Sequence, residues 1–142
     1  MAENILPRIP RSIGSRRNIT IVASLYNEKL VNSLIDSTNN ELTRIMPNIS
    51  VAIYRVPGAF EIPATVKKVA STLSVDAVVT LGAIIKGETR HFDFISSECT
   101  RAIQQLTLDF NIPIIFGVLT TENTKQALDR ATKKDKGYEV MT

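Results

Sequence analysis

The chain has 142 residues, a length typical of one domain, and its 44% hydrophobic content can supply a core. No apolar run approaches the roughly 18 residues of a membrane span, and residues 1–17 lack the apolar stretch of a signal peptide. The net charge of +3 resides in those 17 residues, so residues 18–142 are neutral, and we expect neither a membrane protein nor a nucleic-acid-binding one.

The first 17 residues combine arginine and serine with proline and glycine, which predicts a flexible basic N-terminal arm before a single domain at 18–142. A short organelle-targeting segment is the alternative interpretation of the same composition. The single cysteine, Cys99, cannot form an internal disulfide, and its place on an apolar helical stripe favours a buried reduced thiol over a reactive one. A reduced thiol is typical of the cytoplasm, where we expect the protein.

Strand-like runs alternate with helical patterns from residue 19 onward. Residues 19–24 predict a first strand, and the helix that follows ends before Pro47 and has an apolar face of Leu30, Leu34, Leu42 and Ile45. Residues 49–56 are β-branched and alternating, which predicts a second strand. A second helix begins near Glu61 with Pro63 in its first turn, where a missing N–H costs little.

The second half of the chain repeats the pattern. Residues 77–85 are almost continuously apolar, as in a parallel strand covered on both faces, and a helix is expected from about 91 to 109. Residues 112–119 predict the fourth strand, and 124–132 a shorter helix capped by Thr121 or Asn123. The alternation predicts an α/β protein with a parallel sheet between helices. Ligands of such sheets bind at the carboxyl ends of the strands, near the switch point of the topology.

The strand at 77–85 runs into the most informative segment, residues 82–94, which read GAIIKGETRHFDF. Gly87, Glu88 and Thr89 can turn tightly and present backbone N–H groups, and His91 stands where a helix begins. Backbone donors at a helix N-terminus bind anions, and an imidazole transfers protons near neutral pH. The segment therefore predicts a phosphate and a proton transfer in one place. The plainer interpretations are that His91 caps the helix and that Lys86 and Arg130 are solvated.

Two further strand ends carry residues with both a functional and a structural interpretation. After the second strand, Gly58 could let the backbone approach a ligand and Glu61 could accept hydrogen bonds from hydroxyls. Alternatively, Phe60 staples the helix start and Glu61 complements its dipole. After the first strand, Tyr26 could stack on a heterocycle, although a half-buried core tyrosine is the simpler expectation. One histidine and one cysteine make no metal cluster, and no Walker loop, dinucleotide fingerprint or nucleophile elbow occurs.

Three separated blocks resemble the lumazine synthase family in the correct order: residues 57–63 (PGAFEIP), 81–93 (LGAIIKGETRHFD) and 113–123 (PIIFGVLTTEN). The resemblance extends from about residue 18 to residue 139. It implies a flavodoxin-like three-layer sandwich around a four-stranded parallel sheet. It also implies homopentamers, which some members assemble into icosahedral shells, with active sites between subunits.

The implied activity is that of 6,7-dimethyl-8-ribityllumazine synthases, transferases that carry out the penultimate step of riboflavin biosynthesis. The reaction condenses 5-amino-6-ribitylamino-uracil with 3,4-dihydroxy-2-butanone 4-phosphate. An imine forms, phosphate leaves, and the ring closes with loss of water. The family uses no metal or organic cofactor. Non-catalytic flavin- or lumazine-binding proteins, shell proteins and a riboflavin synthase of the same general fold are the competing interpretations.

The resemblance also implies a role for each matching residue. His91 matches the proton-transfer residue, and Arg130 the arginine that contacts phosphate. The phosphate-holding turn is matched by Gly87, Glu88 and Thr89. The positions that hold the ribitylaminouracil are matched by Tyr26, Ala59, Phe60, Glu61, Ala83, Ile84, Ile85, Phe116 and Lys136, with Phe116 expected from a neighbouring subunit.

The chain departs from the family pattern at several points. Tyr26 replaces the usual Phe or Trp, and Arg90 adds a cation beside the phosphate turn. Residues 130–137 are shorter than the glycine-rich linker of shell-forming members, which favours a separate pentamer and leaves the match of Lys136 open. The family also continues past the position of Thr142 into a last helix, so we expect that either this helix is missing or the sequence is cut short.

Overall fold

The structure is a computed structural model that describes residues 16–72, 74–87 and 90–131. Its elements in chain order are β1 (Asn18–Ser24), α1 (Glu28–Ile45), β2 (Ser50–Val56), the short 3-10 turn η1 (Ala59–Glu61), α2 (Ile62–Thr72), β3 (Ala77–Ile85), α3 (His91–Asp109), β4 (Ile114–Thr121) and α4 (Thr124–Ala131). The four predicted strand-then-helix units are therefore confirmed, with boundaries that shift by one or two residues.

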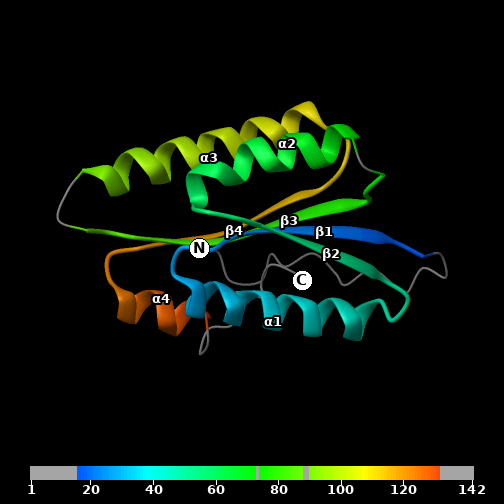
Figure 1. The fold of residues 1–142 in the computed structure, drawn as a ribbon, viewed down its shortest axis with the longest axis horizontal. Coiled ribbons are helices and arrows are strands. Elements are labelled where there is room, and N and C mark those ends of the chain that lie inside the picture. Colours follow the sequence, from blue (N-terminus) through cyan, green and yellow to red (C-terminus); the bar gives the residue numbers. More distant parts are fainter. Residues whose placement is uncertain (1–15, 73, 88–89, 132–142) are drawn as a thin grey trace, which may run out of the picture.

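The four strands form one parallel sheet in the order β2-β1-β3-β4. Helices α2 and α3 cover one face of this sheet, and α1 and α4 cover the other (Figure 1). The predicted α/β, flavodoxin-like three-layer sandwich is confirmed. The chain winds outward from β1 to β2 and then crosses back to β3 and β4, so the switch point of the topology lies between β1 and β3.

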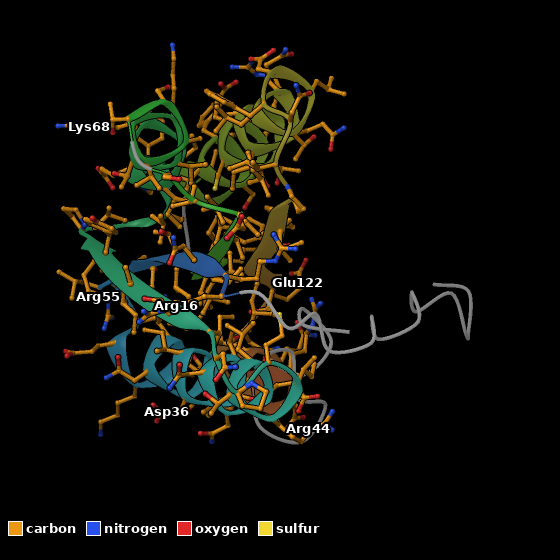
Figure 2. All side chains as sticks on the ribbon, turned by 90° about the vertical axis from the view of Figure 1, so that its right-hand side faces the viewer. Arg16, Asp36, Arg44, Arg55, Lys68 and Glu122 are labelled. Carbon is orange, nitrogen blue, oxygen red and sulfur yellow. The ribbon has the colours of Figure 1, made fainter. Side chains whose placement is uncertain are left out.

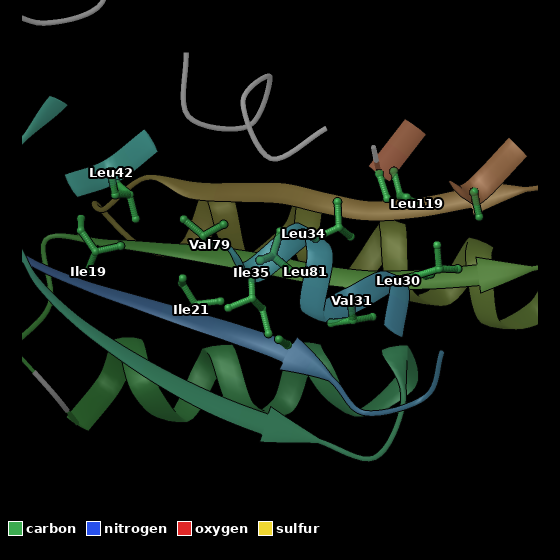
Figure 3. Packing of buried hydrophobic residues seen from close by; sticks show 14 residues of the cluster. Ile19, Ile21, Leu30, Val31, Leu34, Ile35, Leu42, Val79, Leu81 and Leu119 are labelled. Atoms are coloured by element: carbon green, nitrogen blue, oxygen red, sulfur yellow. The ribbon is translucent and has the colours of Figure 1, made fainter. Parts of the chain in front are cut away.

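Side chains of the strands alternate between two hydrophobic clusters, because successive residues of a strand point to opposite faces. Along β3, Val79 and Leu81 join the cluster beneath α1 and α4, whereas Val78 and Ile84 join the cluster beneath α2 and α3. Figure 3 shows the first cluster, whose labelled members are Ile19, Ile21, Leu30, Val31, Leu34, Ile35, Leu42, Val79, Leu81 and Leu119. Both faces of the central strands are thus buried, which explains the nearly continuous apolar run at 77–85.

The residues that precede α4 and α3 show which of the predicted helix caps are correct. The side-chain Oδ1 of Asn123 accepts the N–H of Gln126 at 2.9 Å, so Asn123 caps α4, while the Thr121 hydroxyl donates to the Asn123 carbonyl at 3.1 Å. Of the two caps predicted for this helix, Asn123 is the correct one. At α3 the cap position is held by Arg90, and His91 is the first helical residue, so the interpretation of His91 as a cap was wrong.

Charged side chains lie around the outside of the sandwich. Figure 2 shows Asp36 on α1, Arg55 on β2 and Lys68 on α2 reaching outward, and all three residues are exposed. Among the helices within the described ranges, none combines the length and the apolarity needed to cross a membrane.

Candidate active site

A cavity of about 640 Å³ opens at the carboxyl ends of β1, β2 and β3, on either side of the switch point. Its lining comes from four stretches of the chain: Tyr26 after β1, the turn after β2, the end of β3 with Gly87, and the N-terminal part of α3. The lining residues are Tyr26, Pro57, Gly58, Ala59, Phe60, Glu61, Ala83, Ile84, Ile85, Gly87, His91, Phe92 and Ile95. The cavity lies at the strand ends where the sequence predicted a small-molecule site.

Tyr26 follows β1 at the mouth of this cavity. Its backbone N–H donates to the carbonyl of Pro57 at 3.0 Å, and the N–H of Leu25 donates to the carbonyl of Val56 at 2.7 Å. These two bonds extend the pairing of β1 with β2 beyond the strand ends. The Tyr26 residue is 73% exposed, so the expectation of a half-buried core tyrosine was wrong. An exposed phenol ring at the edge of a cavity can stack on a flat ligand.

The turn after β2 is held by Glu61. Its Oε2 accepts the backbone N–H of Gly58 at 3.0 Å, and the Glu61 N–H donates to the Gly58 carbonyl at 3.2 Å. The structural interpretation of Glu61 at the helix start is therefore correct. A carboxylate has two oxygens, however, and Glu61 also lines the cavity beside Phe60, which is 58% exposed. The two interpretations of this turn are compatible.

The end of β3 contributes Ala83, Ile84 and Ile85 to the cavity lining. Residues 83–85 remain paired with β4, and the N–H of Lys86 extends that pairing to the Thr121 carbonyl at 2.9 Å. Lys86 Nζ lies 3.6 Å from Glu122 Oε2, and both side chains are largely exposed. This cation thus makes a surface ion pair at the strand end, in agreement with the interpretation of Lys86 as solvated.

His91 belongs to the first turn of α3 and faces the cavity together with Phe92 and Ile95. The α3 N-terminus therefore borders the cavity, where the positive end of the helix dipole favours an anion. Gly87 lines the same side, and a Cβ added there would meet no described atom within 4 Å. The other two residues of the predicted phosphate turn, Glu88 and Thr89, lie outside the described residues, as does Lys136.

Cys99 lies beneath the turn after β2. Its Sγ donates to the carbonyl of Ala59 at 3.4 Å, and the residue is 1% exposed. Burial raises the pKa of the Cys99 thiol to about 11, so the thiol stays protonated at neutral pH. The predicted buried, reduced thiol is confirmed. Within the described ranges, no three His, Cys, Asp or Glu side chains are grouped so as to hold a metal ion.

Two predicted site residues stand away from this cavity. Phe116 is on the edge strand β4 and is 38% exposed, and Arg130 is on α4, on the opposite face of the sheet from α3. Neither belongs to the cavity lining of its own chain. Sequence reasoning missed Phe92 and Ile95 as lining residues, although Ile95, four residues after His91, would share a face with it in a helix that begins there.

Comparison with known proteins identifies the family. The model of the 6,7-dimethyl-8-ribityllumazine synthase family matches residues 16–142. One relative, a 6,7-dimethyl-8-ribityllumazine synthase of Chlorobium phaeovibrioides, is 48% identical over 125 residues, which cover 86% of this chain and 81% of that protein. The match spans the whole sheet and all the strand ends that form the cavity. The chain therefore belongs to the 6,7-dimethyl-8-ribityllumazine synthase family, a family of transferases of riboflavin biosynthesis.

Proposed function

We propose that the chain catalyses the condensation of 5-amino-6-ribitylamino-uracil with 3,4-dihydroxy-2-butanone 4-phosphate, and that the reaction takes place in the cavity at the carboxyl ends of β1–β3. The observation that carries this proposal is the convergence of four kinds of group on one cavity. These are the Tyr26 ring, the Glu61 carboxylate, the backbone at the end of β3, and His91 at a helix N-terminus. Each suits a different part of the two substrates.

The pyrimidine is assigned to the side of the cavity formed by Tyr26 and residues 83–85. A phenol ring can stack on a planar heterocycle, while backbone N–H and C=O groups can pair with its polar edge. Ala59, Phe60 and Glu61 are assigned to the ribityl chain, because the second carboxylate oxygen of Glu61 can accept hydrogen bonds from hydroxyls. Apolar walls with a few placed polar groups are typical of sites for small ligands.

The phosphate is assigned to Gly87, Glu88 and Thr89 beside the N-terminus of α3. His91 then stands between the phosphorylated ketone and the amine, where it can carry a proton from one step to the next. The amine adds to the ketone carbonyl and loses water to form an imine, phosphate leaves, and ring closure releases a second water. Holding both reactants together can contribute about 7 kcal/mol or more in favourable cases, and one general acid–base adds roughly a hundredfold.

Phe116 and Arg130 enter the proposal as residues of a neighbouring subunit. Both lie away from the cavity of their own chain, so an arginine that contacts the phosphate from α4 has to come from another copy. We assign Lys136 to the pyrimidine on the basis of the sequence alone. We further assign the assembly to a homopentamer or a multiple of one, as the family resemblance implies, with each cavity completed across an interface. The buried reduced thiol of Cys99 agrees with a cytoplasmic location.

The function is tested by following lumazine absorbance when the purified protein meets both substrates, against the uncatalysed background. The matched control replaces the phosphorylated ketone with the same ketone without phosphate. Acceleration that requires the phosphate supports the proposal. Ligand binding without acceleration would instead identify a non-catalytic lumazine-binding protein, and formation of riboflavin from two lumazines a riboflavin synthase.

Completion of the site across an interface is tested by mixing two variants that are each slow alone. His91→Ala and Arg130→Ala are each expected to be slow alone, because one lacks the proton carrier and the other a phosphate contact. After joint unfolding and reassembly, some cavities combine an intact His91 with an intact Arg130 from the neighbour, so part of the turnover returns. If the mixture stays as slow as the separate variants, both residues act within one subunit, and the assignment of Arg130 to a neighbour is wrong.

A further inference from the structure

Asn27, the residue between Tyr26 and α1, has an unusual backbone conformation. Its φ of 61° and ψ of 47° are left-handed, and among the described residues it is the one non-glycine residue with positive φ. Asparagine tolerates this region better than most residues. An asparagine in front of a helix usually accepts a hydrogen bond from the first helical N–H groups through its side chain. The Asn27 side chain makes no such bond at α1.

The side chain of Asn27 instead reaches the end of a different strand. Its Nδ2 donates to the carbonyl of Ala83 at 3.1 Å. The pairing between β1 and β3 ends at Ala23 and Leu81, whereas β3 continues to Ile85 alongside β4. Ala83 therefore lies beyond the last partner that β1 provides, and the Asn27 amide takes the place of a backbone N–H there. A carbonyl only accepts hydrogen bonds, which fixes the amide nitrogen as the atom that faces it.

The segment that carries Tyr26 is consequently tied on both sides. Toward β2, the N–H groups of Leu25 and Tyr26 donate to the carbonyls of Val56 and Pro57. Toward β3, the Asn27 side chain holds Ala83. Tyr26 and residues 83–85 line the same cavity, so the Asn27 bond joins the two segments assigned to the pyrimidine.

We propose that Asn27 is a positioning residue for the pyrimidine substrate: its side-chain amide sets the separation between the Tyr26 ring and the end of β3. This role rests on the proposed function, since the substrate is a flat heterocycle that has to contact both groups at once. The phosphate side of the cavity, near Gly87 and His91, has no direct part in the Asn27 bond. Loss of the Asn27 amide should therefore weaken binding of the pyrimidine substrate and leave binding of the butanone phosphate unchanged.

Two substitutions separate the amide from the backbone conformation. Asn27→Gly accepts positive φ without strain and removes the side chain. Asn27→Asp keeps the shape of the side chain, but its carboxylate accepts hydrogen bonds and cannot donate one to Ala83 at neutral pH. We expect both variants to raise the KM for the ribitylaminouracil roughly tenfold, the equivalent of about 1.4 kcal/mol, with an unchanged KM for the butanone phosphate.

Asn18→Gly is the matched control, because Asn18 lies at the opposite end of β1 and its Nδ2 donates to the Ser74 carbonyl at 3.4 Å. This variant loses a similar amide–carbonyl bond far from the cavity, so both KM values should match those of the unsubstituted protein. Thermal unfolding of all three variants accompanies the kinetics. A purely structural role of Asn27 would lower the unfolding temperature and leave the pyrimidine KM unchanged.

The outcomes separate this proposal from the function on which it rests. A rise confined to the pyrimidine KM in both Asn27 variants supports the positioning role. An unchanged pyrimidine KM in Asn27→Gly and Asn27→Asp overturns it while leaving the proposed function intact. If the unsubstituted protein forms no lumazine, the proposed function and the Asn27 role fall together.

Discussion

The centre and the carboxyl end of the same sheet differ in what surrounds their side chains. Leu81, in the middle of β3, is fully buried, whereas Tyr26 and Phe60, at the strand ends, are 73% and 58% exposed. The centre is covered by helices on both faces, and the end opens into a cavity of about 640 Å³. Packing therefore limits which side chains fit at the strand centres, whereas side chains at the strand ends are free to contact a ligand. Substitutions in the two regions should have separable effects on stability and turnover.

The largest separable effect is expected from His91→Ala, at the rim of the cavity. Loss of the proton carrier should slow lumazine formation about a hundredfold. The unfolding temperature should not change, because His91 is exposed in the first turn of α3. Steady-state kinetics and thermal unfolding of one preparation measure both quantities. Turnover equal to that of the unsubstituted protein would remove His91 from the mechanism.

The second comparison uses two glycines from the two regions. A Cβ at Gly82, in the packed part of β3, would lie 3.1 Å from Ser24 Oγ and 3.3 Å from Ile62 Cδ1, closer than ordinary contact, whereas Gly87 at the rim has open space. Gly82→Val should therefore cost about 1–3 kcal/mol of unfolding free energy through overpacking, although valine favours strands.

Gly87→Ala should leave the free energy of unfolding unchanged and alter only the KM for the phosphorylated ketone. Urea unfolding of both glycine variants, with the KM for that ketone, distinguishes the regions. Equal stability of the two variants would show that the close approach at Gly82 is relieved at no cost.

The last prediction concerns pH and Cys99, a buried residue of the core beneath α2 and α3. Burial raises the thiol pKa from 9.0 to about 11, so the unfolded chain loses this proton at lower pH than the folded one. The contribution of the protonated Cys99 thiol to folding stability is therefore complete below pH 9. It is lost as the pH rises from 9 to about 11, because over this range the folded state binds more protons than the unfolded state. The stability difference between the unsubstituted protein and Cys99→Ala should narrow over this range in urea unfolding. A stability difference that stays constant from pH 9 to about 11 would contradict the raised pKa of the Cys99 thiol.

Much of the fold could be read from the pattern of apolar residues. The run at 77–85 predicted a doubly covered strand because burial on both faces leaves no polar alternation, and Asn123 was among the two caps expected for the last helix. The environment of Tyr26 was not predictable in the same way. Tyr26 follows the end of β1, and its exposure depends on how the strand ends and the turns after them are arranged in space, which no local pattern records.

The sequence by itself determined the order and type of the elements, the family, and the residue types available at each strand end, because these depend on local periodicity and on motifs. The tertiary structure alone decided that Phe92 and Ile95 line the same cavity as Tyr26 and Glu61, and that Asn27 donates to Ala83 across 56 residues of chain. Contacts of this kind arise when β1 and β3, far apart in sequence, become neighbours in the sheet. The distance between two strand ends is a property of the assembled sheet, and neither segment encodes it separately.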